Sequence, residues 1–188
     1  HAYCETCASV GMVFWNQRMT AMSGNAEYID VLERSLYNGA LDGLSLSGDR
    51  FFYGTPLASR GQHQRREWFG TACCPANIAR LIASLGDYIY AKSNDAIYVN
   101  LYVGSNTLIP LTTGDVGVKM ETNYPWEGAV ALQIDPVKSA TFTLKMRIPQ
   151  WAYTTFNSPG NLYKGSSNGF HAFSILLNGK EVPYREEN

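Results

Sequence analysis

The periodicity of the apolar residues changes once along this chain of 188 residues, near Asn94. Before that point apolar residues recur three and four positions apart, as at Ile78, Leu81 and Leu85, which is the spacing of one helix face. After it they alternate with polar residues, as over residues 142–148, which is typical of a strand with one buried face. The chain therefore cannot be a helical bundle alone or a sheet alone. We predict a mainly helical part followed by an all-β part, an antiparallel β-sandwich.

Three helices are predicted in the first part. The first spans residues 10–21 and stops at Gly24, the second spans residues 28–36 after a capping Asn25, and the third starts at Pro75. A short strand is expected at 51–53 and an irregular loop at 56–68. Three helices do not close a core by themselves, so we expect large exposed apolar faces, at the positions Val10, Phe14, Leu32 and Leu81.

Strands are predicted in the second part over residues 97–103, 116–121, 130–134, 142–148 and 173–177. The dipeptide Asn178-Gly179 indicates a hairpin turn whose return strand is missing. The chain also opens at His1 without Met or a signal segment. We interpret it as a fragment truncated at both ends. Three parts are predicted: the end of a helical domain at 1–91, a β-sandwich at 92–152, and the start of a further β domain at 153–188.

Composition excludes several classes of partner. Fifteen Lys and Arg residues against sixteen Asp and Glu residues give a net charge of -1, which argues against nucleic acid or an anionic membrane as partner. No apolar run approaches the roughly 18 residues of a membrane span. Aromatic residues make up 13% of the chain and suit cores, interfaces or sugar faces. A homodimer is compatible with this surface.

The four cysteines form two close pairs in the helical part, Cys4 with Cys7 and Cys73 with Cys74. The predicted sandwich has none, which disfavours a disulfide framework and favours a cytoplasmic location with reduced thiols. The remaining interpretations are a metal site and four buried small apolar residues. Glu5 adds a carboxylate to the first pair, and a helix start beside the second pair favours thiolates there. Both details support the metal site.

Several motifs occur in an order that resembles glycoside hydrolase family 127, the β-L-arabinofuranosidases, and the related family 146. The resemblance covers roughly residues 1–152. The motifs are Glu-Thr-Cys-Ala at 5–8, Leu-Tyr-Asn-Gly at 36–39, Phe-Phe-Tyr at 51–53, Trp-Phe-Gly at 68–70, Cys-Cys-Pro-Ala-Asn at 73–77 and Ile-Tyr-Val-Asn-Leu-Tyr at 97–102. This family implies an (α/α)6 barrel followed by β-sandwich domains. It also implies a retaining enzyme that releases terminal β-L-arabinofuranose from an arabinofuranose-containing oligosaccharide or glycan.

The resemblance also implies the roles of individual residues. By position, Glu5, Cys7, Cys73 and Cys74 are the ligands of Zn²⁺, and Cys73 is also the nucleophile. The family's acid/base glutamate would lie before His1, so the chain by itself is expected to be inactive. Cys4 falls outside the ligand set and is interpreted as packing.

Other residues near the cysteines receive weaker assignments. Trp68 and Phe69 stack either on a furanose ring or within an aromatic core. A basic loop contains Arg60, His63, Arg65 and Arg66, and it is either solvated or binds hydroxyl groups. The rival to the enzyme is a non-enzymatic carbohydrate-binding or scaffold protein with a structural zinc site.

Overall fold

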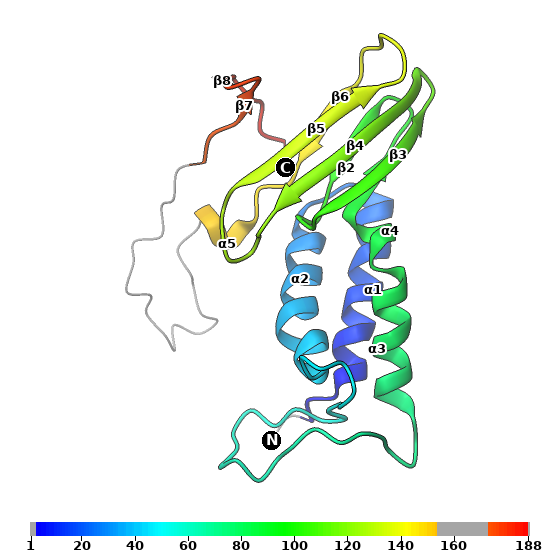
Figure 1. Ribbon diagram of the computed structural model, residues 1–188, viewed down its shortest axis with the longest axis vertical. Helices are drawn as coiled ribbons and strands as arrows, with labels where there is room; N and C mark the ends of the chain where they lie inside the picture. The colour runs from blue at the N-terminus through cyan, green and yellow to red at the C-terminus, as the bar shows by residue number, and fades with distance from the viewer. Residues whose placement is uncertain (1–2, 154–172, 188) are drawn as a thin grey trace. The chain divides into compact units, whose positions relative to one another are not determined.

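The computed structural model describes residues 3–153 and 173–187. The chain forms two compact units, His1–Arg147 and Ile148–Asn188. The first unit contains helices α1 to α4 followed by strands β1 to β6, and the second contains α5, β7 and β8 (Figure 1). The predicted order of helices and then mainly antiparallel sheets is confirmed.

Helices α1 (Thr6–Ser23) and α2 (Glu27–Ser35) meet at a tight turn. Gly24 ends α1 with a φ of 72°, a left-handed conformation that favours glycine, and its N–H donates to the Thr20 carbonyl. Asn25 Oδ1 accepts the N–H of Glu27, the first residue of α2, at 2.8 Å, but it does so from one position before Ala26, which is the N-cap residue. The chain continues through a π-helical turn (Leu36–Ala40) and a 3-10 turn (Leu41–Gly43).

Helix α3 (Cys73–Ser84) begins two residues before the predicted start, and a short helix, α4 (Gly86–Ile89), follows it. Pro75 is the third helical residue, still within the first turn, where a missing N–H removes no intrahelical hydrogen bond. Cys73 and Cys74 therefore belong to the helix. Among the described helices, none has both the length and the apolarity of a membrane span.

The predicted exposure of the helical apolar faces is wrong at the named positions. Val10, Leu32 and Leu81 are fully buried in one core cluster, and Phe14 is partly buried against it. The core is closed because Leu101, from the segment after β2, packs into the same cluster. Exposed apolar side chains lie on other positions of α1 and α3: Met12, Trp15, Met22 and Ile82.

The first sheet has the order β1 (Tyr90–Lys92), β2 (Ala96–Val99) and β6 (Thr143–Met146). Strands β1 and β2 are antiparallel, but β2 and β6 are parallel, with Ala96 opposite Thr143. The expectation of purely antiparallel pairing is therefore wrong. A parallel pair needs a long crossover connection, and the second sheet supplies it here.

The second sheet is an antiparallel meander of β3 (Ser105–Leu111), β4 (Gly114–Thr122) and β5 (Val130–Pro136). Strands β4 and β5 are predicted correctly, whereas β3 is missed and the strand predicted at 97–103 ends at Val99. The pattern of β3 is weak because Leu108 points outward and is exposed, while its inward positions include Ser105 and Thr107.

The two sheets share one apolar cluster. Ile97 of β2 is buried with Ile109 of β3 and Val116 of β4, and Leu144 of β6 packs against them. The apolar faces of the two sheets thus contact each other. The complete β-sandwich and the (α/α)6 barrel stay predictions.

A buried ion-pair network, called here the Arg147 junction, joins α2 to the strands. Arg147 Nη1 lies 2.6 Å from Asp30 Oδ1, and Nη2 lies 2.6 Å from Glu33 Oε1. Arg147 Nε donates to the carbonyl of Asn100 at 2.7 Å, and the Tyr124 hydroxyl donates to Glu33 Oε1 at 2.8 Å. Each charged group is therefore paired within a nearly water-free contact between helix and sheet.

The second unit contains α5 (Gln150–Tyr153) and a hairpin of β7 (Leu176–Leu177) and β8 (Lys180–Glu181). Asn178 and Gly179 have φ values of 52° and 78°, as a two-residue hairpin turn requires. The turn is confirmed, but the return strand expected to be missing is present as β8. The predicted three-part division of the chain stays a prediction, and much of its third part lies outside the described residues.

Candidate metal centre

The segment 51–55 fixes the start of α1. Glu5, the residue before the helix, forms an isolated β-bridge with Gly54. The N–H of Thr6 donates to the carbonyl of Tyr53 at 3.0 Å. This pairing holds the backbone from which the side chains at positions 5 and 7 project.

A close backbone approach at Gly43 brings the starts of α1 and α3 together. A Cβ atom at Gly43 would lie 2.5 Å from Thr6 Cγ2 and 3.2 Å from Ile78 Cδ1. Thr6 begins α1 and Ile78 lies in α3, so the glycine allows both helices to approach the 3-10 turn.

Cys73 and Cys74 form the first turn of α3. The N–H of Cys73 donates to the carbonyl of Thr71 at 2.9 Å, and Cys74 Sγ donates to the carbonyl of Tyr53 at 3.5 Å. Cys74 is fully buried, whereas Cys73 is half-buried. The N–H groups and dipole at a helix start favour negative charge on these sulfurs.

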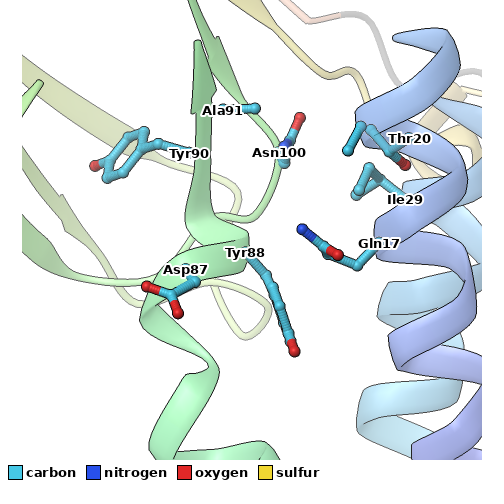
Figure 2. Close-up of a pocket in the computed structure, with 9 residues that line it drawn as sticks. Gln17, Thr20, Ile29, Asp87, Tyr88, Tyr90, Ala91 and Asn100 are labelled. Carbon is cyan, nitrogen blue, oxygen red and sulfur yellow. The ribbon is translucent and has the colours of Figure 1, made fainter. Parts of the chain in front are cut away.

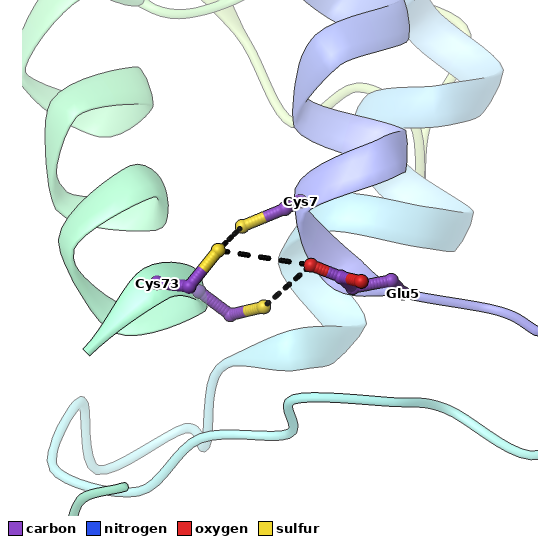
Figure 3. Close-up of side chains that lie close together, drawn as sticks. Glu5, Cys7 and Cys73 are labelled. Carbon is purple, nitrogen blue, oxygen red and sulfur yellow. Dashed lines mark hydrogen bonds between the residues drawn. The ribbon is translucent and has the colours of Figure 1, made fainter. Parts of the chain in front are cut away.

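The four predicted ligands converge although they are far apart in sequence. One ligand atom from each of Glu5, Cys7, Cys73 and Cys74 lies within 4.8 Å of all the others (Figure 3). Cys73 Sγ lies 2.9 Å from Cys7 Sγ and 3.7 Å from Glu5 Oε1, and Cys74 Sγ lies 3.9 Å from Glu5 Oε1. The predicted clustering is confirmed, and we call these four residues the metal centre.

The donor set and its spacing fit a four-coordinate ion. Bond lengths of about 2.3 Å to sulfur and 2.0–2.2 Å to oxygen place tetrahedral ligand atoms roughly 3.6–3.8 Å apart. The 3.7 Å between Glu5 Oε1 and Cys73 Sγ lies in that range, and the 3.9 Å between Glu5 Oε1 and Cys74 Sγ lies slightly above it. The 2.9 Å between the sulfurs of Cys7 and Cys73 is much shorter. The metal centre could therefore hold a metal ion after a small separation of these two sulfurs.

Burial raises the pKa values of two of the thiols, whereas a bound cation would lower them. Burial raises the pKa of the Cys7 thiol, and a hydrogen bond with Cys73 adds to the rise. Burial also raises the pKa of Cys74 far above the usual range. A bound cation favours thiolates instead, so metal binding at this centre must release protons.

Tyr53 is a residue of this site that the sequence analysis missed. Its interaction with the Cys73 side chain raises the pKa of Tyr53 to about 12, and burial acts in the same direction. A tyrosine hydroxyl is protonated at neutral pH in any case, and the raised pKa extends this protonated range to more alkaline pH. The Phe-Phe-Tyr motif marks the position, but no sequence spacing connects Tyr53 to Cys73.

The basic loop is held by its own contacts. Arg65 lies over the ring of Phe52, with its Cζ 4.4 Å from the ring centroid, and Nη2 donates to the carbonyl of Asp42 at 2.6 Å. His63 stacks on the same Phe52 ring, with ring centroids 4.9 Å apart. These contacts give Arg65 and His63 a structural role, and hydroxyl binding by the loop stays a prediction.

The two aromatic residues before the cysteine pair differ in exposure. Trp68 is 59% exposed and contacts the edge of Phe51, whereas Phe69 packs against Tyr53 with centroids 5.5 Å apart. Stacking of either ring on a sugar stays a prediction. Phe69 nevertheless reaches the site, because Tyr53 contacts Cys73.

Cys4 lies outside the metal centre, as predicted. Its side chain is half-buried, and its backbone carbonyl accepts the N–H of Thr55 at 2.8 Å. This backbone bond adds to the pairing of segment 51–55 with the start of α1. Its assignment to packing stays a prediction.

A small cavity lies at the other end of α1. Residues from α1, α2, α4, β1 and the segment after β2 line its volume of about 30 Å³, which has room for one or two water molecules (Figure 2). The lining residues are Gln17, Thr20, Ala21, Ile29, Asp87, Tyr88, Tyr90, Ala91 and Asn100. The cavity is too small for a sugar and is separate from the metal centre.

Two family models match the chain in succession. Residues 1–87 match the catalytic domain of GH127 β-L-arabinofuranosidases, and residues 96–188 match the GH127 middle domain. The border between the two matches falls where the helices give way to strands.

Individual proteins show the same similarity. The chain is 38% identical over 164 residues to a non-reducing end β-L-arabinofuranosidase of Bifidobacterium longum subsp. longum, covering 80% of this chain and 25% of that protein. A solved GH127 β-arabinofuranosidase matches with a TM-score of 0.89 and 43% identity over 99% of this chain and 29% of its own. A GH127 β-L-arabinofuranosidase from Geobacillus stearothermophilus T6 matches with a TM-score of 0.81 and 39% identity, over 97% of this chain and 28% of its own. The chain thus spans about a quarter of the length of the curated relative.

Proposed function

The chain belongs to glycoside hydrolase family 127, the β-L-arabinofuranosidases, and we propose that the protein containing it is a retaining glycosidase that releases β-L-arabinofuranose from the non-reducing end of glycans. The observation that carries the proposal is the convergence of Glu5, Cys7, Cys73 and Cys74. Three sulfurs and a carboxylate form a reactive cluster that a merely structural helix pair does not need.

We assign Zn²⁺ to the metal centre, because a mixed set of three sulfurs and one carboxylate suits zinc better than harder divalent ions. When bound, Zn²⁺ would offset the negative charge of its ligands and keep the sulfurs deprotonated at neutral pH.

Cys73 is the nucleophile in this proposal. Of the two sulfurs in α3, Cys74 is fully buried and bonded to a backbone carbonyl, whereas Cys73 is half-buried. Cys73 also interacts with the Tyr53 side chain, and this interaction raises the Tyr53 pKa. A sulfur that attacks a substrate has to be both accessible and held in one direction.

The reaction follows from these positions. Cys73 Sγ attacks the anomeric carbon while the bond to the leaving oxygen breaks, and a proton donor protonates that oxygen. Water then displaces the sulfur from the opposite side, gives its proton to the deprotonated proton donor and leaves Cys73 as a thiolate. The two displacements together retain the anomeric configuration.

The proton donor is assigned to a residue outside this chain, in accordance with the family resemblance. Glu67, which precedes the cysteine pair by six residues in the sequence, has a side chain that is 74% exposed and forms an ion pair with Arg50 at 2.8 Å. An exposed carboxylate in an ion pair stays ionised, so Glu67 does not suit the role of a general acid.

The test uses the full-length protein with 4-nitrophenyl β-L-arabinofuranoside as substrate. We expect hydrolysis with the β-anomer as first product by NMR, about one zinc per chain, and loss of both on chelation with recovery on adding zinc. Zinc without hydrolysis would instead favour the carbohydrate-binding or scaffold protein. The α-anomer as first product would overturn retention.

A further inference from the structure

The closest pair of sulfurs in the metal centre comes from two different helices. Cys7 Sγ on α1 and Cys73 Sγ on α3 lie 2.9 Å apart, and both side chains are half-buried. Two zinc-bound sulfurs would lie about 3.8 Å apart, whereas a disulfide bond is about 2.05 Å long. The observed separation of the two sulfurs thus lies between these two values.

The other pairings of the three sulfurs are less suited to a bond. Cys73 and Cys74 are adjacent in the chain, so a bridge between them needs a strained local geometry. Cys74 is fully buried and its sulfur is bonded to the Tyr53 carbonyl, which shields it from a dissolved oxidant. Cys7 and Cys73 are therefore the pair that can be both reached and joined.

We propose that Cys7 and Cys73 form a reversible disulfide bond on exposure to a hydroperoxide. This bond releases the metal ion and protects the nucleophile from irreversible oxidation. The loss of metal and activity rests on the proposed function, whereas formation of the bond rests only on the geometry of the two sulfurs.

The chemistry balances in two steps. The Cys73 sulfur attacks the outer oxygen of hydrogen peroxide, forms an S–OH group, and releases hydroxide, which takes a proton to become water. The Cys7 sulfur then attacks the Cys73 sulfur, forms the S–S bond and expels a second hydroxide, which also becomes water. Each sulfur loses one electron, and the peroxide takes up both.

The bond would remove two of the four ligands. Disulfide sulfurs carry no thiolate charge, so only Glu5 and Cys74 would remain for the ion. A dithiol reductant would restore both thiolates. In contrast, a lone oxidised Cys73 would proceed to sulfinic acid, which a dithiol does not reduce.

The experiment treats the zinc-loaded full-length protein with hydrogen peroxide and measures zinc release with a chromogenic chelator, lost thiols, and cross-linked tryptic peptides by mass spectrometry. Trypsin leaves Cys7 in the peptide that ends at Arg18, and Cys73 in the peptide between Arg66 and Arg80. We expect these two peptides to be joined, with loss of about two thiols and one zinc per chain, and dithiothreitol with zinc to reverse all three changes.

Variants identify the bonded residues. Cys4→Ala should keep the cross-link, because Cys4 shares the first peptide but lies outside the cluster. Cys7→Ser should lose it and instead accumulate sulfinic acid on Cys73, a mass change that dithiothreitol leaves in place.

The outcomes separate this inference from the proposed function. A cross-link in a protein without glycosidase activity would uphold the disulfide and overturn the enzyme. An active, zinc-loaded protein in which peroxide yields sulfinic acid at Cys73 without any cross-link would overturn the disulfide alone. A cross-link that persists in Cys7→Ser would also overturn it.

Discussion

The metal centre and the Arg147 junction are two clusters of ionisable groups with opposite electrostatic designs. The metal centre brings together four acids, three thiols and a carboxylate, with ligand atoms within 4.8 Å of one another. The Arg147 junction brings two carboxylates to a guanidinium, which lies 2.6 Å from each, and Tyr124 completes it. The junction thus contains its own cation, Arg147, whereas the metal centre consists of acidic groups alone and depends on a bound cation to offset their charge.

The difference separates a binding cluster from a structural one. Burial raises the thiol pKa values of Cys7 and Cys74, so the folded chain resists charging these groups. At the junction, burial opposes the charge of Arg147, but the Glu33 carboxylate reverses this effect and raises the Arg147 pKa. Groups whose charge is unfavourable alone and favourable with an ion are expected at a binding site, and the following predictions test that distinction.

The largest expected effect is at the nucleophile. In the full-length protein, Cys73→Ser should lower kcat by at least about 10³-fold, because a hydroxyl is a poorer nucleophile and a harder ligand than a thiolate. Steady-state hydrolysis of the aryl arabinofuranoside measures this. Cys4→Ala is the matched control and should keep both zinc content and rate within about twofold. Full activity in Cys73→Ser would remove the cysteine nucleophile.

The next effect concerns stability at the junction. Arg147→Met should destabilise the protein by about 3–5 kcal/mol, because Asp30 and Glu33 would stay buried without their cation. Urea unfolding measures the change, and zinc content should be unaffected. Arg50→Met is the control at an exposed ion pair and should cost only about 0–1 kcal/mol. Equal losses in the free energy of unfolding for the two variants would show that the buried ion pairs stabilise the fold no more than an exposed ion pair does.

A smaller effect is expected at Tyr53. Tyr53→Phe removes the hydroxyl whose pKa is raised by Cys73 and should lower kcat/KM by roughly 10–100-fold while zinc stays bound. Steady-state kinetics together with metal analysis measure this split. An unchanged rate would mean that Tyr53 only packs beside the centre.

The slope per pH unit of metal binding is the most modest change predicted. Because buried thiols must lose protons to bind zinc, the zinc affinity should rise at least about tenfold per pH unit from pH 6 to pH 8. Competition with a chelator of known affinity measures this slope. A flat profile would contradict the raised thiol pKa values.

The same pKa shifts determine how the stability of the zinc-free protein changes with pH. A thiol whose folded pKa is raised leaves stability unchanged below the ordinary thiol pKa of about 8.5. Stability then falls as the pH rises above that value, because the unfolded chain loses its protons first. The Arg147 junction should add no such dependence between pH 6 and pH 10, since the raised pKa keeps Arg147 charged.

The amino-acid sequence by itself determined the local features of the chain. The spacing of apolar residues predicted the switch from helices to strands, and Gly24 and the Asn178-Gly179 turn were identified because their backbone conformations depend on neighbouring residues alone. The four residues of the metal centre were also found from the sequence, because the Glu-Thr-Cys and Cys-Cys-Pro motifs carry a specific family resemblance.

Only the tertiary structure decided the features that join distant segments. The parallel pairing of β2 with β6, the contact of Tyr53 with Cys73 and the ion pairs of Arg147 connect residues that no local period relates. The burial of Val10 was missed for the same reason, since Leu101 from the strand region helps to close the helical core. A sequence pattern records which face of an element is apolar, but its partner depends on packing among all the elements, which is a property of the whole fold.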